Sequence, residues 1–193
     1  MADSQGASEA WDGKAAVKRD GAMKGNLICW RCAVVTWSQF EGEAPELAGL
    51  ALARFKATDL MMLGTLRKDG FPRISPIEWA IFDGDLTLGG MWQAKKALDL
   101  LRDPRCTLHS TTANKNGQEG DAKIWGRATP LLPEREDGYW QKVFDDTGWR
   151  PAGPAHVFTI DIESAAYLVF TPDGTMRRLQ WPGSGDWIET KSE

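Results

Sequence analysis

Cysteine and histidine, the residues that form disulfides and bind transition metals, are scarce: three cysteines and two histidines occur in 193 residues. Cys29, Cys32 and Cys106 are too few for a disulfide scaffold. The Cys29-Trp30-Arg31-Cys32 spacing lacks the second ligand pair of a structural zinc site and the βαβ context of a redox motif. We therefore expect no metal site, treat Cys29 and Cys32 as incidental, and expect Cys106 to be buried in a strand.

The chain also lacks a long hydrophobic run and an excess of basic charge. The segment Asn26–Trp37 is interrupted by Arg31, is too short to span a bilayer, and starts too deep for an ordinary signal peptide. The net charge of -4 argues against a nucleic-acid partner, because neutralisation of phosphates dominates that affinity. An oligonucleotide-binding barrel would also need a basic groove with interleaved stacking aromatics, which we do not find. We expect a cytoplasmic protein with neither a membrane nor a nucleic-acid partner.

The sequence contains ten tryptophans, and its regular hydrophobic pattern covers a length typical of one domain. Residues 1–33 are rich in Ala, Gly, Asp and Lys without a sustained period, which predicts a disordered or loosely packed extension. Residues 34–193 are long enough for one hydrophobic core. The tryptophans favour a wide buried surface that includes a subunit contact, although core filling alone would explain them equally well.

Turn residues and hydrophobic periodicity predict a mainly β chain with peripheral helices. Strands are predicted at Leu60–Arg67, Pro72–Phe82, Leu86–Gly90, Arg105–Thr112, Asp121–Leu132, Ala155–Phe170 and Thr175–Trp181. Helices are predicted at Pro45–Ala57, at Pro133–Asp145, and in a short basic segment that ends at Asp103-Pro104. Long helices do not alternate with strands, and no glycine-rich dinucleotide loop is present. These features favour a closed antiparallel barrel of six to seven strands over a doubly wound sheet.

The short basic helix has its own pattern. An apolar stripe is predicted from Ala94, Ala97, Leu98 and Leu101, with Lys95, Lys96, Asp99 and Arg102 pointing away from it. Basic residues at the start of a helix lie beside free N–H groups and a partial positive charge, which suits a phosphate.

A turn at Lys68-Asp69-Gly70 adds further polar groups to this basic region. Alternate residues of a strand share a face. The side chains that the turn brings together are Thr65 and Arg67 on one strand and Arg73 and Ser75 on the next. Together with Lys95 and Lys96 they form a candidate phosphate site, because arginine offers a forked donor and lysine a point charge. A mixed solvated surface is the alternative that the sequence leaves open.

Five segments carry a family resemblance. They are Leu63–Gly70, Pro72–Ile77, Asp83–Leu86, Lys95–Arg105 and Trp125–Ala128. In this order and spacing, Thr36–Trp181 resembles the pyridoxamine 5'-phosphate oxidase-like family of split-barrel flavin and deazaflavin oxidoreductases. The resemblance implies an FMN-binding split β-barrel and a homodimer, with the cofactor ring at the subunit interface.

For the phosphate end of the cofactor, the resemblance implies four residues. Thr65 and Arg67 would lie near the phosphate side, Lys96 would hold the phosphate, and Lys95 would lie beside it. Many relatives have Ser or Thr before the basic pair, where this chain has Ala94, so one hydroxyl of the phosphate cradle is missing.

For the rest of the cofactor, the resemblance implies two groups of residues. Arg73, Ser75 and Pro76 would line the ring or sugar chain, the ring largely through backbone groups. Trp125 and Arg127 would close the site, with the partner chain as one source. No counterpart of the substrate-binding C-terminal segment of the true vitamin-B6 oxidase is found, so oxidation of pyridoxamine phosphate is not expected.

The expected activity is hydride transfer to or from a small organic substrate, with FMN or the deazaflavin coenzyme F-420 as cofactor. The cofactor carries this chemistry, which agrees with the absence of a recognisable catalytic triad. Catalytic residues are not identified; Glu78 is expected to pair with a lysine or arginine. The alternative is a carrier or sensor that binds flavin or haem without turnover, with His109 or His156 as haem ligand. Otherwise we expect His109 to be hydrogen-bonded in a strand and His156 to be exposed.

Overall fold

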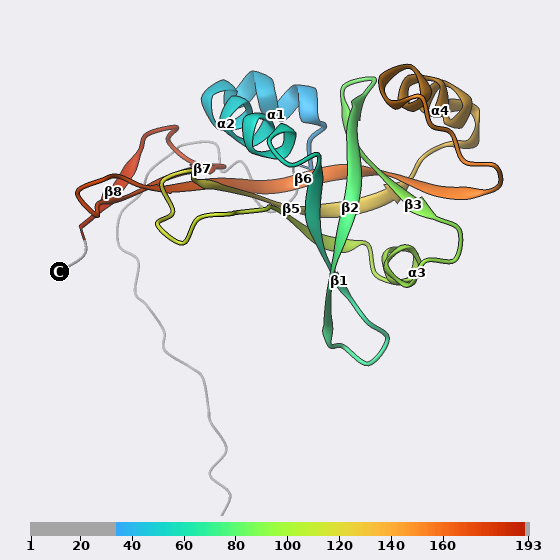
Figure 1. The fold of residues 1–193 in the computed structure, drawn as a ribbon, viewed down its shortest axis with the longest axis horizontal. Helices are drawn as coiled ribbons and strands as arrows, with labels where there is room; N and C mark the ends of the chain where they lie inside the picture. The colour runs from blue at the N-terminus through green and yellow to red at the C-terminus, as the bar shows by residue number, and fades with distance from the viewer. Residues whose placement is uncertain (1–33, 192–193) are drawn as a thin grey trace, which may run out of the picture.

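Eight antiparallel strands form one sheet that closes on itself in a computed structural model, which describes residues 34–191 (Figure 1). The strands are β1 (Leu60–Leu66), β2 (Pro72–Phe82), β3 (Asp85–Met91), β4 (Arg105–Ser110), β5 (Asp121–Pro130), β6 (Ala155–Phe170), β7 (Met176–Trp181) and β8 (Ile188–Thr190). Their order is β3-β2-β1-β4-β5-β6-β7-β8, and a further pairing of β3 with β6 closes six of them into a barrel. The predicted extension at 1–33, with Cys29 and Cys32, lies outside the described residues.

The predicted mainly β class and closed antiparallel barrel are confirmed. The barrel itself has six strands, and β7, which was also predicted, and β8 extend the sheet beyond it, on the left in Figure 1. The prediction missed β8, which has only three residues, all of them exposed, and therefore no alternation to read.

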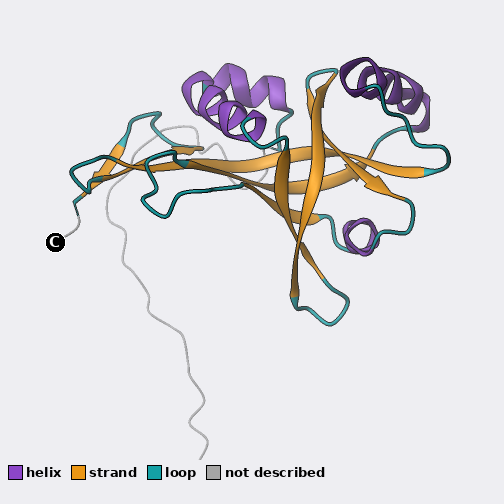
Figure 2. Ribbon diagram, in the orientation of Figure 1, coloured by secondary structure: helices purple, strands orange, loops and turns teal. Residues whose placement is uncertain are grey.

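Four helices lie on the outside of the barrel (Figure 2). They are α1 (Trp37–Glu43), α2 (Pro45–Lys56), α3 (Lys95–Arg102) and α4 (Pro133–Thr147). The sequence prediction missed α1, which begins at a capping box: Thr36 Oγ1 accepts from the Gln39 N–H and the Gln39 side chain accepts from the Thr36 N–H. Between residues 34 and 191, no helix has both the length and the apolar character needed to cross a bilayer.

Tight turns set the register of the hairpins that build the site. Gly70 (φ 83°) turns β1 into β2, and Asp83-Gly84 (φ 49° and 80°) turns β2 into β3. In β1 the buried residues are Met61, Leu63 and Thr65, the alternation expected of a strand with one face on the core. Thr65 pairs with Arg73, so the predicted meeting of these two residues is confirmed.

The predicted apolar stripe of the basic helix is confirmed at Ala97, which is buried, and wrong at Leu98 and Leu101. In α3, Leu98 and Leu101 are 39% and 50% exposed, whereas Asp99 and Leu100 are buried. The helix turns a different face to the barrel from the one predicted, because the buried Asp99 carboxylate has hydrogen-bond donors there. Thr65, Arg73 and Arg102 all donate to it. Hydrophobic periodicity places every carboxylate outside and therefore misassigns the face of this helix.

A bulge in β5 brings two backbones unusually close. The register with β6 shifts between Trp125 and Gly126, and a Cβ built on Gly126 would lie 2.3 Å from the Asp161 carbonyl oxygen. Only glycine fits there, because the atom in the way belongs to backbone rather than to a flexible side chain.

We expect Gly126→Ala to lower the free energy of unfolding by about 2 kcal/mol, the cost of forcing strands apart. Gly49→Ala is the matched control: Gly49 lies inside α2 with nothing within 4 Å of the added Cβ, so this change should stabilise by about 0.5 kcal/mol. Urea unfolding of both variants measures the difference. Equal stability of the two variants would contradict the close approach.

Cys106 is buried in β4, as expected, with its Sγ 3.6 Å from the Gly126 carbonyl oxygen. Burial, with a smaller contribution from Glu163, raises the pKa of the thiol to about 12. Because the thiolate is the reactive form, Cys106 should resist alkylation by iodoacetamide at pH 8 in the folded protein and react in urea. Peptide mass spectrometry reads both states, and comparable labelling of Cys106 in the two would refute this.

Candidate functional site

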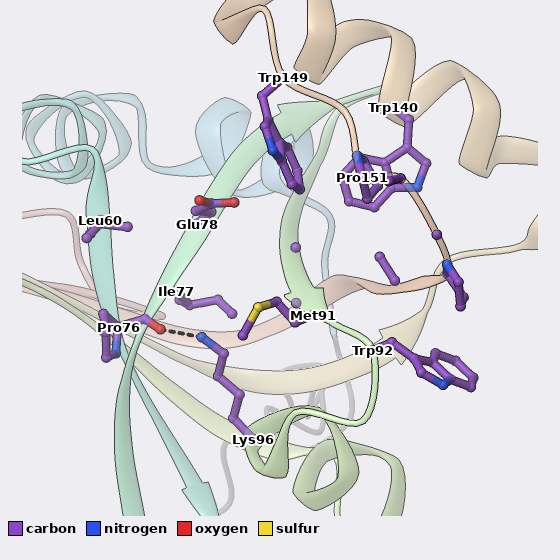
Figure 3. A pocket seen from close by; sticks show the side chains of 16 residues that line it. Leu60, Pro76, Ile77, Glu78, Met91, Trp92, Lys96, Trp140, Trp149 and Pro151 are labelled. Atoms are coloured by element: carbon purple, nitrogen blue, oxygen red, sulfur yellow. Dashed lines mark hydrogen bonds between the residues drawn. The ribbon is translucent and has the colours of Figure 1, made fainter.

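A cavity of about 590 Å³ opens between the strands β2 and β3, the start of α3, and the segment that follows α4 (Figure 3). Its lining is mainly apolar and aromatic. The lining residues are Leu60, Pro76, Ile77, Glu78, Gly89, Gly90, Met91, Trp92, Lys96, Trp140, Trp149, Pro151, Ala152, Gly153, Pro154 and Ala155. Such a size and lining are typical of a small-molecule or cofactor site.

Lys96 marks one end of the cavity. Its ammonium group donates to the Pro76 carbonyl oxygen at 2.5 Å, from the first turn of α3 to the strand β2 (Figure 3). Burial lowers the pKa of Lys96, and the negative charge of Glu78 opposes that shift. Among residues 34–191 it forms no ion pair, so a half-buried cation is available to an anionic ligand.

The N-terminus of α3 lies beside Lys96 and has no side-chain cap. Ala94 is the N-cap residue, and it offers no oxygen to the free N–H groups of the first turn. The preceding Gln93 adopts a left-handed conformation (φ 59°) that turns the chain from β3 into the helix. Because Ala94 lacks a hydroxyl, the first-turn N–H groups of α3 have no side-chain acceptor at the N-cap.

Aromatic side chains form the opposite wall. Trp140 comes from α4, and Trp149 from the segment after that helix; Trp149 points into the cavity in Figure 3. They lie in edge-to-face contact, with ring centroids 6.1 Å apart. The sequence prediction missed this wall, since nothing in the chain between α4 and β6 shows which face of the barrel it folds back on.

Glu78 lies at the same end as these tryptophans. It belongs to β2, between Leu60 of β1 and Gly89 of β3, and its carboxylate stands near Trp149 in Figure 3. The expected lysine or arginine partner is not found: no ion pair of Glu78 occurs in the described part of the chain. The cavity thus has a cation at one end and an anion at the other.

A second hollow lies on the other side of α3, between that helix and the β1–β2 turn. It also measures about 590 Å³, and its lining residues are Arg67, Lys68, Asp69, Arg73, Lys95, Leu98, Asp99 and Arg102. Asp99 is one of these lining residues, is buried, and accepts from Arg73 Nε at 2.6 Å, Thr65 Oγ1 at 3.1 Å and Arg102 Nη2 at 3.1 Å. We call this arrangement the Asp99 cluster. It ties α3 to both strands of the hairpin.

The predicted cofactor residues are therefore divided. Pro76 and Lys96 line the first cavity, while Arg67, Arg73 and Lys95 line the second hollow. The other predicted residues lie elsewhere: Thr65 is buried against Asp99, Ser75 is half-buried on β2 beside Leu63, and Trp125 and Arg127 lie on β5.

Within one chain, Trp125 and Arg127 do not join the others. In the sheet, β1 and β4 stand between β5 and β2. Arg127 Nε donates to Glu163 at 2.7 Å, and Trp125 borders a separate hollow beside β6 and β7. Any contribution of these two residues to the same cofactor requires a second copy of the chain.

Both histidines are already engaged. His156 stacks on Trp92 with ring centroids 4.6 Å apart and accepts from the Gln93 N–H at 3.3 Å, so it is half-buried rather than exposed as predicted. His109 Nδ1 lies 2.5 Å from the Ser110 carbonyl oxygen, which confirms the expected hydrogen-bonded role. Neither arrangement favours an axial haem ligand.

The hydrogen bonds of Asp99 contribute to the free energy of unfolding in a way that depends on pH. Burial alone would raise its pKa, but hydrogen bonds from Arg73, Arg102 and Thr65 outweigh burial and lower the pKa. Because the pKa is lower in the folded state, this stabilisation is full above the pKa of an unfolded aspartate, about 3.9, and is lost as the pH falls towards the lowered value.

We expect Asp99→Ala to cost about 3 kcal/mol at pH 7, the lower range for breaking a buried ion pair, and to cost less as the pH falls below about 4. Asp137→Ala is the control; it removes an exposed carboxylate that pairs with Arg150 and should cost at most about 0.5 kcal/mol. Denaturant unfolding at several pH values measures both. A pH-independent cost for Asp99→Ala would argue against the cluster.

Comparison with known proteins adds a family and a set of similar folds. The sequence profile described as pyridoxamine 5'-phosphate oxidase matches residues 50–169. No curated protein sequence matches the chain.

Among solved structures, PhzG from Burkholderia lata 383, in complex with tetrahydrophenazine-1-carboxylic acid, is similar with a TM-score of 0.56 at 14% identity, over 90% of this chain and 100% of PhzG. The conserved hypothetical protein Rv2991 from Mycobacterium tuberculosis is similar with a TM-score of 0.50 at 18% identity, over 70% of this chain and 86% of that one. Atu2129 from Agrobacterium tumefaciens, of unknown function, gives a TM-score of 0.51 at 14% identity, over 56% of this chain and 50% of its own. At these identities the likeness concerns the fold.

Proposed function

The chain belongs to the pyridoxamine 5'-phosphate oxidase family, and from this premise we propose that it is an FMN- or deazaflavin-dependent oxidoreductase. Its reaction is the transfer of hydride to or from a small organic substrate. The observation that carries the proposal is the position of Lys96. Lys96 lines a cavity with mainly apolar walls, and it belongs to the first turn of α3, which has no side-chain cap.

The residues present fit a phosphorylated flat cofactor. A phosphate needs positive charge and N–H donors, and Lys96 with the free backbone groups of α3 supplies both. A ring system needs flat, apolar walls, and the backbone at Pro76 and at Gly89-Gly90 presents few side chains to the cavity. When bound, FMN or the deazaflavin would supply the hydride chemistry, while the chain provides binding, orientation and exclusion of water.

The remaining predicted residues take supporting parts in this proposal. Lys95 would add positive charge beside the phosphate, from the opposite side of α3. Arg73 would act partly through Asp99, since its Nε is already bound to that carboxylate. Trp125 and Arg127 would contribute across the interface of a homodimer. We do not propose a haem carrier, because both histidines are engaged.

Lys96→Ala should weaken binding of FMN by about tenfold to a hundredfold, the effect of losing one charge-assisted hydrogen bond. The control is Lys68→Ala, in the β1–β2 turn, which removes the same charge from an exposed position away from the first cavity. Its effect should stay within about threefold, because solvent and salt screen it.

The measurement is a fluorescence titration of each variant with FMN and, separately, with the deazaflavin. Mass spectrometry of the ligand released from the purified protein identifies which of the two it carries. Equal losses in the two variants would remove Lys96 as the anchor, and failure of the wild-type protein to bind either cofactor would refute the proposed function.

A further inference from the structure

Acidic and aromatic side chains line the end of the cavity around Glu78. A smaller adjoining cavity of about 380 Å³ shares Leu60, Glu78, Trp140 and Trp149 with the first one. Its other charged side chains are Asp59 and Asp146, and no lysine or arginine of the described residues lines it. Carboxylates and tryptophan rings therefore line the smaller cavity and the part of the first cavity that adjoins it.

The carboxylates that line these cavities differ in whether they already form an ion pair. Asp146 is paired with Lys142 at 2.7 Å, so part of its charge is neutralised. Glu78 has no ion-pair partner in residues 34–191. Lys96 is the cation of the first cavity, and the proposed function assigns it to the cofactor phosphate. With that end satisfied, Glu78 is the charge that a second ligand meets.

Aromatic rings complete the environment. Trp140 contacts Tyr139 edge-to-face with ring centroids 4.8 Å apart, and it contacts Trp149 in the same way at 6.1 Å. The pKa of Tyr139 is raised to about 12, first by burial and then by the charge of Glu78, so its hydroxyl stays neutral. Electron-rich ring faces beside a carboxylate attract organic cations, by cation–π attraction as well as by direct pairing.

We propose that this end of the cavity is the substrate subsite and that it selects a flat organic cation, such as a protonated amidine or a ring with a cationic nitrogen, through Glu78. Anionic compounds of the same shape are rejected, because they would face the negative charge of Glu78, which has no ion-pair partner in residues 34–191. The role of this end as a substrate subsite rests on the proposed function. The preference for a cation does not, since Glu78 and the aromatic rings that produce the preference belong to the chain.

The test uses three probes of nearly equal shape and different charge: 4-aminobenzamidine, 4-aminobenzamide and 4-aminobenzoate. Isothermal titration calorimetry of the protein without added cofactor, and then of the protein saturated with FMN, gives an affinity for each. We expect the amidinium to bind about tenfold more tightly than the amide in both states. We expect the benzoate to bind more weakly than the amide when FMN is present.

Glu78→Gln keeps the size of the side chain and removes its charge. It should bring the affinity for the amidinium down to that for the amide, while binding of FMN stays within about threefold of the wild type. Asp137→Asn is the matched control: it makes the same change of charge on α4, at a residue that lines neither cavity. It should leave all three affinities unchanged.

Three results would overturn the inference: equal binding of the three probes, no binding of any of them, or an amidinium preference that survives Glu78→Gln. The outcomes also separate this inference from the proposed function. A preference for the amidinium in a protein that binds neither FMN nor the deazaflavin would refute the cofactor and keep the cationic subsite. FMN binding without that preference would do the reverse.

Discussion

The Asp99 cluster is the constraint on which the candidate site depends. A buried carboxylate in the middle of α3 accepts from Arg73 of β2, from Thr65 of β1 and from Arg102 one turn further along the helix. These bonds fix the rotation of α3 and its position across the β1–β2 hairpin. Because the helix is fixed there, Lys96 reaches the Pro76 carbonyl and lines the first cavity.

The position of α3, fixed by the Asp99 cluster, also separates two groups of basic residues, one on each side of the helix. Arg67, Arg73 and Arg102 lie with carboxylate partners on one side of α3, whereas Lys96 lies on the other side with a carbonyl oxygen alone. Charges that are already paired hold the fold, and the unpaired ones remain for ligands. By this criterion Lys96 and Glu78, at opposite ends of one cavity, are the groups that a bound molecule meets.

Much of the fold could be predicted from the sequence, because the barrel strands carry local signals. Gly70 and the Asp83-Gly84 pair mark the hairpin turns, and the predicted bounds of β2 and β6 agree with the structure. The face of α3 could not be predicted, because burial of Asp99 depends on partners 26 and 34 residues away in the chain. The aromatic wall was missed for the same kind of reason. Trp149 reaches the cavity only because the segment between α4 and β6 lines it together with residues of β2 and β3.

Of the predicted site residues, Pro76 and Lys96 line the first cavity and Arg67, Arg73 and Lys95 line the second hollow, while their roles towards a cofactor stay predictions. Sequence spacing cannot tell a cation that is paired inside the chain from one that is free. We propose that a cofactor phosphate binds at the first turn of α3. A crystal structure of the protein grown with FMN tests this directly. We expect the phosphate of FMN to lie within hydrogen-bonding distance of Lys96 Nζ and of the backbone N–H groups at the start of α3. A phosphate held elsewhere, with Lys96 still bound to Pro76 alone, would contradict it.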